Sequence, residues 1–367
     1  MTAQDDRRHM AAALALGARG QGRCWPNPAV GCVIVRDGRV IGRARTADGG
    51  RPHAEMRALA MAGPAARGAT AYVTLEPCAH HGATPPCAES LVAAGIARVV
   101  IAAADPDPRV AGRGVAILRA AGIAVMEGVL ADRAERDLAG FLSRTTRGRP
   151  AVTLKLAASL DGRIATATGE SRWITGPEAR RAVHAMRARH DAVMVGAGTA
   201  RADDPMLDVR GLGIDRQPVR VVLSRHLDLP GGGRLGHSAR DLPLWLCHGP
   251  TAAADLRTAW QGRGAILVPC EVEGGQLDPA SVLAALGARG LTAVFCEGGG
   301  ALAASLICAG LVDRLVTFQA GLAIGAEGTP ALAAMGLGRL AEAPRFVLEE
   351  VRPLGPDTLA TWRPAGT

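Results

Sequence analysis

Short apolar runs alternate with segments of helical periodicity along most of this chain. In the first 130 residues, the apolar runs at 30–36, 71–75, 99–103 and 123–126 predict strands. Helical periodicity at 8–20, 53–62, 87–94 and 114–121 predicts helices between them. Asp37-Gly38 predicts a hairpin turn into a returning strand at 39–42. This alternation predicts an α/β sandwich with helices on both faces of the sheet.

The pattern breaks at 143–150, where SRTTRGRP is polar and turn-rich, and then it restarts. Strands are predicted at 151–158, 191–195, 218–223, 244–247, 265–268 and 292–296, and helices at 176–188 and 279–288. A chain of 367 residues is too long for one typical core. We therefore expect two α/β domains, 1–147 and 148–367.

Composition narrows the class of protein. Hydrophobic residues make up 48% of the chain, but no uninterrupted apolar run is long enough to span a membrane, and the N-terminus lacks a secretory signal. The eight cysteines form no disulfide framework, which favours a reducing, cytoplasmic setting. The net charge of +8 could suggest nucleic acid, but the arginines are scattered and aromatic residues are only 3%. We expect small anionic partners instead, with neither nucleic acid nor membrane among them.

The strongest chemical signal is a group of three metal-binding side chains. His53, Cys78 and Cys87 can supply three ligands of a tetrahedral Zn²⁺ and leave the fourth position for water. Glu55, two residues after His53, is placed to move protons without touching the metal. This pattern is typical of zinc-dependent deaminases of nucleobase-like rings. The alternative, a solvated histidine and two buried thiols, is much weaker.

Two further features lie in the second half. Nearly every cation is arginine, and Lys155 is the single lysine, so it is either a compact ammonium kept for a purpose or a chance survivor. FCEGGGALAASLICAG at 295–310 predicts a strand, a glycine-rich turn and a helix, where backbone N–H groups could approach a phosphate. Its spacing matches neither the dinucleotide fingerprint nor the P-loop.

The spacing of the two thiols separates this chain from most deaminases. Cytidine and tRNA-type deaminases place two residues between the cysteines, whereas CAHHGATPPC places eight. With WPNPAVGCVIV and DPDPRVAGRG, this closely resembles the bifunctional riboflavin biosynthesis family, in which a pyrimidine deaminase is fused to a reductase. The second half resembles the same family through RPAVTLKLAASLDGRIA, GESRWITG, HAMRARHDAVMVGAGTARADDPMLDVR and FCEGGGALAASLICAGLVDRL.

The resemblance implies both fold and chemistry. The N-terminal domain would have the cytidine-deaminase-like fold and deaminate 2,5-diamino-6-ribosylamino-4(3H)-pyrimidinone 5′-phosphate. The C-terminal domain would resemble dihydrofolate reductase and reduce the ribosyl side chain to ribityl with NADPH. The family is usually oligomeric, commonly a homodimer.

The resemblance also assigns site residues. His53, Cys78 and Cys87 match the zinc ligands, Glu55 the proton shuttle and Asn27 a contact to the substrate ring. The matching NADPH contacts are Ala157, Trp173, Thr199, Asp203, Gly298, Gly299, Gly300, Ala301, Leu302, Ala303, Ala304 and Ser305. The matching contacts to the reductase substrate are Ser171, Arg187, Leu207, Arg210 and Glu297, and Lys155 falls near both ligands.

The chain departs from the family pattern at a few positions. Many relatives have His at Thr46, a basic residue at Ala83 and Asn at Asp107, so contacts to phosphate or ribose must be made differently. A serine used for NADPH aligns with Arg225, with Ser224 one step earlier, and the loop between Arg210 and Pro218 is short. Two alternatives stay open: a deaminase with a degenerate reductase that serves as a binding module, and a nucleic-acid base deaminase.

Overall fold

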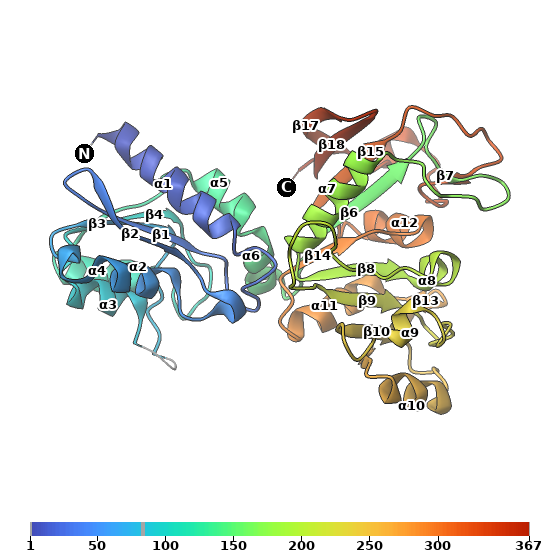
Figure 1. Ribbon diagram of the computed structural model, residues 1–367, viewed down its shortest axis with the longest axis horizontal. Coiled ribbons are helices and arrows are strands. Elements are labelled where there is room, and N and C mark those ends of the chain that lie inside the picture. Colours follow the sequence, from blue (N-terminus) through green and yellow to red (C-terminus); the bar gives the residue numbers. More distant parts are fainter. Residues whose placement is uncertain (1, 82–84, 367) are drawn as a thin grey trace. The chain divides into compact units, whose positions relative to one another are not determined.

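The computed structural model describes residues 2–81 and 85–366. The chain divides into two compact units, Met1–Gly148 and Arg149–Thr367 (Figure 1). The boundary expected from the sequence, after residue 147, differs from this division by one residue. Among the described residues, no helix is long and apolar enough to cross a membrane.

The first unit is built on a five-stranded sheet in the order β2-β1-β3-β4-β5. β1 is antiparallel to both β2 and β3, whereas β3, β4 and β5 are parallel. The inner strands β1, β3 and β4 are almost wholly buried because helices cover both faces, whereas the edge strands β2 and β5 are largely exposed. The strands are β1 (Gly31–Arg36), β2 (Arg39–Arg45), β3 (Thr70–Leu75), β4 (Arg98–Ala103) and β5 (Ala124–Met126).

Two layers of helices enclose this sheet (Figure 1). α1 packs with α5, and α2, α3 and α4 pack with one another. The helices are α1 (Ala3–Ala18), α2 (Ala54–Ala62), α3 (Cys87–Ala93), α4 (Arg113–Ala120), α5 (Ala131–Asp137) and α6 (Ala139–Arg147), with 3₁₀ turns at Asp48–Gly50 and Gly63–Ala66. The expected α/β/α sandwich is confirmed.

Two expectations about helices in this unit are wrong. The first helix begins at Ala3, not at residue 8, because Thr2 and Asp5 cap each other reciprocally and the polar start is stabilised. The segment at 143–150 is not a turn-rich linker, because α6 runs through it to Arg147. Phe141 and Leu142 pack on the core of the first unit, and the helix ends only at Gly148, whose φ is 68°.

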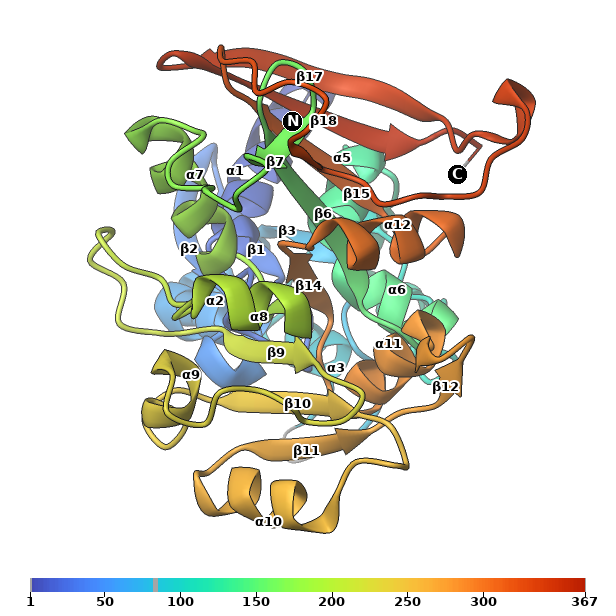
Figure 2. The same cartoon turned by 90° about the vertical axis from the view of Figure 1, so that its right-hand side faces the viewer.

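The second unit is built on a nine-stranded sheet in the order β11-β10-β9-β8-β14-β6-β15-β18-β17 (Figure 2). The strands from β11 to β15 are parallel, and the edge strands β18 and β17 are antiparallel. They are β6 (Ala151–Ala158), β8 (Ala192–Gly196), β9 (Val219–Leu223), β10 (Leu244–His248), β11 (Ile266–Pro269), β14 (Ala293–Cys296), β15 (Arg314–Gln319), β17 (Phe346–Leu354) and β18 (Asp357–Pro364).

Helices and short strands complete this unit. The helices are α7 (Pro177–Ala188), α8 (Ala197–Asp203), α9 (Arg234–His237), α10 (Ala254–Gly262), α11 (Pro279–Ala288) and α12 (Gly300–Cys308), with a 3₁₀ turn at Leu340–Glu342. The short strands are β7 (Arg163–Ala165), β12 (Val272–Glu273), β13 (Gln276–Leu277) and β16 (Thr329–Pro330).

The order of the strands predicts where this unit binds ligands. The chain passes from β6 through α7 to β8, and β14 later fills the place between these two strands. In open parallel sheets, ligands bind beyond the carboxyl ends of the strands where the strand order reverses. Here that point is marked by the loops that follow β6, β8 and β14.

Candidate functional site

The metal-binding histidine of the first unit lies at the start of α2. His53 is the residue before the helix, with extended backbone, and Glu55 is in the first turn. Glu55 is only 4% exposed, and this burial raises the pKa of its carboxyl to about 6. The sequence therefore places a histidine and a desolvated carboxyl at one helix end.

The two thiols reach the same point from another part of the chain. Cys78 follows β3, and Cys87 is the first residue of α3, whose free N–H donates to Cys78 Sγ at 3.3 Å. His53 Nδ1 lies 3.7 Å from Cys78 Sγ and 3.3 Å from Cys87 Sγ. Hydrogen bonding from Cys87 and His53 lowers the pKa of the Cys78 thiol to about 4.

This donor set fits Zn²⁺. The three ligand atoms all lie within 4.8 Å of one another. A tetrahedral zinc with ordinary bond lengths separates a nitrogen and a sulfur ligand by about 3.6 Å, close to both measured separations. One imidazole and two sulfurs, one of them favoured as thiolate, leave a fourth position open for a reacting water. His53, Cys78 and Cys87 would thus hold the metal.

A cavity of about 200 Å³ opens beside these atoms. Glu55 lines it, as does Asn27, whose side-chain amide donates to Gly50 O at 3.2 Å. That hydrogen bond fixes the Asn27 side chain against the cavity and does not involve its amide oxygen. The structure therefore brings Asn27, Glu55 and the candidate metal ligands together at one site.

Several residues of this cavity were not singled out from the sequence. Asp105 and Arg109 belong to the DPDPRVAGRG motif, and Arg51 lies two residues before His53. Their closeness in sequence to these motifs is the feature that could have identified them. His80 lies between the two thiols in the sequence. Phe141 had no signal, because the sequence analysis predicts no element between residues 126 and 143, where α6 begins.

Three positions of this unit at which the chain departs from the family pattern, Thr46, Ala83 and Asp107, differ in what the structure shows of them. Thr46 is buried, and its hydroxyl donates to Pro28 O and accepts from Val30 N, both at 3.0 Å, so it supports the backbone. Asp107 lines the cavity and pairs with Arg109. Ala83 lies outside the described residues.

In the second unit, strand register places Lys155 beside an acidic residue. β14 ends at Cys296, which pairs with Leu154, so Glu297 comes level with Lys155. Burial lowers the pKa of the Lys155 ammonium, while Glu297 and Asp203 act in the opposite direction. Lys155 lies in the middle of β6, which pairs with β15 as far as Ala158.

The glycine-rich turn after β14 is shaped as a cradle. Gly298 and Gly299 have φ values of 75° and 53°, which favour glycine, and a Cβ at Gly299 would lie 2.9 Å from Thr199 Oγ1. The turn leads into α12, whose first N–H groups have no partner within the helix. These observations fit the pyrophosphate of a dinucleotide.

Other residues matched to NADPH contacts lie around this turn. Thr199, in α8, donates from Oγ1 to Gly298 O at 3.4 Å, and Ala157 is near the carboxyl end of β6. Ala301 and Leu302 follow Gly300 in the first turn of α12. Ala303 and Ala304 are buried, and Ala303 N donates to Gly299 O, so these two side chains are not exposed to a ligand.

The loop before α7 is tied to the end of α8. The guanidinium of Arg172 donates to Asp203 O at 2.6 Å. Its neighbour Trp173 is 65% exposed, with the Arg180 guanidinium 4.7 Å from the ring centroid. Ser171 lies in the same loop. This arrangement presents an exposed aromatic ring to a ligand at the carboxyl edge of the sheet.

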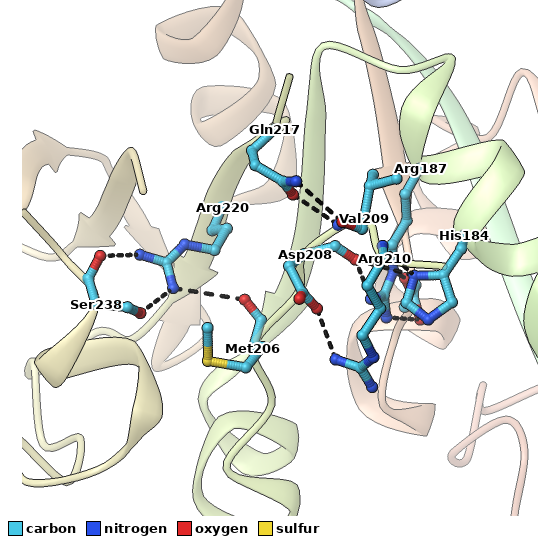
Figure 3. Close-up of polar contacts among 10 residues, drawn as sticks. His184, Arg187, Met206, Asp208, Val209, Arg210, Gln217, Arg220 and Ser238 are labelled. Atoms are coloured by element: carbon cyan, nitrogen blue, oxygen red, sulfur yellow. Dashed lines mark hydrogen bonds and ion pairs between the residues drawn. The ribbon is translucent and has the colours of Figure 1, made fainter. Parts of the chain in front are cut away.

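Two of the matched substrate contacts, Arg187 of α7 and Arg210 of the loop after α8, belong to one connected polar group (Figure 3). Arg187 donates to both carboxylate oxygens of Glu297, at 2.5 and 3.1 Å, and to Asp208 O at 2.8 Å. Arg210 pairs with the Asp208 carboxylate at 2.8 Å. Leu207, before them, is buried with a left-handed φ of 55°, a conformation held by its surroundings.

The short loop after Arg210 is closed by Gln217. Its side-chain amide accepts from Val209 N at 2.7 Å and donates to Val209 O at 2.9 Å (Figure 3). At the end of β9, Ser224 is buried and donates to Asp228, while Arg225 donates to Gly275 O and to His226. The hydroxyl of Ser224 is therefore hydrogen-bonded within the protein. Arg225 stands at the position where relatives have the serine that contacts NADPH.

Two family models cover the chain in succession. Residues 3–103 match the cytidine and deoxycytidylate deaminase zinc-binding region, and residues 150–360 match the RibD C-terminal domain. The first match contains all three residues of the candidate metal site, and the second contains the polar group around Glu297.

Named relatives match over nearly the whole chain. The riboflavin biosynthesis protein RibD of Escherichia coli is 42% identical, covering 96% of this chain and 97% of its own; that of Haemophilus influenzae is 43% identical, covering 97% of each. Among solved structures, Acinetobacter baumannii RibD has a TM-score of 0.87 at 38% identity, with 99% of each chain covered. A Thermotoga maritima diaminohydroxyphosphoribosylaminopyrimidine deaminase/5-amino-6-(5-phosphoribosylamino)uracil reductase has a TM-score of 0.86 at 34% identity, again with 99% of each covered. With its metal site, its reductase fold and this full-length similarity, the chain belongs to the RibD family.

Proposed function

We propose that this chain catalyses two successive steps of riboflavin biosynthesis. The first is hydrolytic deamination of 2,5-diamino-6-ribosylamino-4(3H)-pyrimidinone 5′-phosphate. The second is NADPH-dependent reduction of the ribosyl side chain, which gives 5-amino-6-ribitylaminouracil 5′-phosphate. The observation that carries this proposal is the convergence of His53, Cys78 and Cys87 beside Glu55 in a cavity, in a chain that matches RibD proteins from end to end.

In the deaminase, the protein holds the ring and moves protons. We assign His53, Cys78 and Cys87 as the ligands of Zn²⁺, which when bound supplies the Lewis acidity that activates a water molecule. Asn27 orients the pyrimidine ring through its fixed amide. The Glu55 carboxylate takes one proton from the attacking water and passes it to the ring nitrogen. It then takes the remaining hydroxyl proton and delivers it to the amine, which leaves as ammonia as the carbonyl forms. Its burial in the cavity keeps this transfer away from bulk solvent.

In the reductase, the protein holds two ligands against one another, and NADPH supplies the hydride. We assign the turn 298–300 and the start of α12 to the pyrophosphate, with Thr199 and Trp173 as further cofactor contacts. Arg187, Arg210 and Glu297 are assigned to the substrate, together with Ser171 and Leu207. Lys155 donates to the ribose oxygens, and Glu297 and Asp203 stabilise its positive charge.

We also propose that the protein works as a homodimer in the cytoplasm. Family resemblance supports the dimer. No disulfide links the eight cysteines, all of which lie in the described part of the chain, and this agrees with a reducing compartment. Light scattering of the purified protein at micromolar concentration would measure the mass of the assembly, and a monomer would refute the dimer.

One experiment tests both activities. The purified protein is incubated with the diaminopyrimidine phosphate, without cofactor and then with NADPH or NADH, and the products are separated by chromatography. We expect ammonia and the deaminated ribosyl product without cofactor, and the ribityl product with NADPH in preference to NADH. Deamination without reduction would show that the second unit is a binding module, and absence of both would refute the proposal.

A further inference from the structure

The deaminase cavity contains positive side chains that the chemistry at the ring does not use. Arg51, His80 and Arg109 line the same cavity as His53 and Glu55. The metal ligands and the proton shuttle account for hydrolysis, and Asn27 accounts for the ring. Three donor groups therefore remain without an assigned role.

Arg51 is free to bind a ligand. It lies two residues before His53, the proposed zinc ligand, and its side chain is exposed. Within residues 2–81 and 85–366, its guanidinium makes no hydrogen bond or ion pair, although it lines the cavity. All five of its N–H groups are thus available to an anion.

Arg109 is held in place by Asp107, but part of its guanidinium remains free to bind a ligand. Its Nε donates to Asp107 at 3.0 Å and its Nη2 at 2.5 Å, while its side chain remains 69% exposed. This pairing fixes the planar guanidinium at the wall of the cavity and leaves Nη1 for a ligand. An oriented arginine fork matches the oxygens of a phosphate better than a flexible cation does.

His80 offers a buried polar atom that lacks a partner. Its Nδ1 is inaccessible to solvent and has no hydrogen-bond partner among the described residues. Buried polar atoms are nearly always paired, so an orphan atom beside a cavity indicates a place for a ligand atom. His80 thus adds a third contact near Asp107, whose pKa it helps to lower.

The acidic residues of the cavity wall have hydrogen-bond partners other than Arg51. Glu76 accepts backbone N–H groups of Gly112 and Val115 at 3.1 and 3.2 Å. Asp105 accepts Asp107 N at 2.9 Å, and burial raises the pKa of its carboxyl to about 6. Asp107 pairs with Arg109, so none of these three carboxyl groups ties down the guanidinium of Arg51.

Resting on the function proposed above, we propose that Arg51, His80 and Arg109 form the subsite for the 5′-phosphate of the deaminase substrate. The two guanidinium groups contact the phosphate oxygens, and His80 provides the neighbouring contact at the ribose end. This subsite selects nucleotides over nucleosides and is separate from the groups that perform hydrolysis.

The test compares two substrates in matched variants. Deamination is measured with the diaminopyrimidine riboside 5′-phosphate and with the same riboside lacking the phosphate, for wild type, Arg51→Gln and Arg109→Gln. Arg43→Gln is the control, because Arg43 is an exposed arginine of β2 that does not line the cavity. We expect each cavity variant to lose roughly tenfold or more in kcat/KM for the phosphorylated substrate, but less than about twofold for the riboside.

Inhibition by inorganic phosphate during turnover of the phosphorylated substrate provides a second measurement, because the inhibition constant does not depend on the kcat of the variant. Phosphate should inhibit wild type and Arg43→Gln competitively, with a clearly higher inhibition constant for Arg51→Gln and Arg109→Gln. Equal losses for both substrates, or no loss for either, would overturn the subsite. A wild-type protein that deaminates neither substrate would instead overturn the proposed function.

Discussion

Glu55 illustrates how single residues set the chemistry of the first unit. It is 4% exposed, lies in the first turn of α2, and is near the sulfur atoms that would hold zinc. Its carboxyl can accept and release a proton without being a metal ligand. The neighbouring His53, by contrast, points Nδ1 at both thiols and is committed to the metal.

We predict that Glu55→Gln keeps zinc and loses deamination. Glutamine preserves the size of the side chain but cannot carry a proton, so the rate should fall by roughly 10²–10⁴-fold. Metal content by mass spectrometry and a deamination assay check the two parts. Near-normal turnover in the variant would show that another group moves the proton.

At Lys155, we predict that replacement by arginine strongly reduces reduction and leaves deamination intact. The lysine is half-buried in the middle of β6, where Glu297 and Asp203 act on its charge. A guanidinium is wider and more rigid than an ammonium, so it cannot take the same place between the strands. Steady-state assays of both reactions on one preparation measure this, and an unchanged reduction rate would make the lone lysine an accident of composition.

At the scale of elements, a buried ion pair joins the first helix to the sheet. Asp6 of α1 accepts two hydrogen bonds from Arg98 of β4, at 2.8 and 2.7 Å, and one from Tyr72 of β3 at 2.8 Å. The Asp6 side chain is 4% exposed. Hydrogen bonding from Arg98 lowers the pKa of this carboxyl. The pair therefore stabilises the folded unit only while Asp6 is ionised.

We predict that this stabilisation disappears in acid. Because the pKa is lower in the folded protein, its contribution is complete above the ordinary aspartate pKa of about 3.9 and is lost as pH falls toward the folded value. Asp6→Asn should reduce the free energy of unfolding at pH 7 by about 3 kcal/mol, since it leaves Arg98 without its partner. The difference from wild type should narrow between pH 5 and pH 3 in denaturant unfolding followed by circular dichroism.

Asp37→Asn serves as the control for this experiment. The Asp37 side chain is 91% exposed, and asparagine tolerates its φ of 50°. We expect wild-type stability at each pH. A constant difference between wild type and Asp6→Asn across the whole pH range would contradict the ionic account.

At the scale of the whole molecule, each unit has its own sheet and its own core. The metal ligands belong to Met1–Gly148, and the glycine turn, Lys155 and Glu297 belong to Arg149–Thr367. No residue that we assign to one reaction comes from the other unit. The two activities should therefore be separable by substitution within the intact chain.

We predict that Cys87→Ser loses zinc and deamination while reduction of directly supplied deaminated substrate continues. Serine is a poor zinc ligand, so two protein ligands remain. Cys308→Ser is the matched control, because Cys308 is the exposed cysteine at the end of α12 and should keep one zinc per chain and both activities. Loss of reduction in Cys87→Ser would show that the metal site also supports the second unit.

Local patterns in the sequence predicted the strands of the first sheet, most helices and the identity of the chemical groups. In the second sheet they predicted β6, β8, β9, β10, β11 and β14 but missed β15, β17 and β18. Apolar runs of β length must be buried strands, and His53, Cys78 and Cys87 have few other uses at that spacing. The ends of helices were harder to predict from local patterns. The start of α1 depends on a capping box and an ion pair to β4, and α6 depends on packing of Phe141 and Leu142, so both were missed or misplaced.

Only the tertiary structure decided which side chains face one another. Register between β14 and β6 brings Glu297 level with Lys155, although 142 residues separate Glu297 from Lys155 in the sequence. Packing commits the hydroxyl of Thr46 to the backbone, although Thr46 lines the cavity together with Arg51, His80, Arg109 and Glu55. Residue types and spacing specify which chemistry is possible, because they fix ligands and local conformation. Contacts between distant segments decide where charge is compensated and where it remains for a ligand, because they form only when the strands pair.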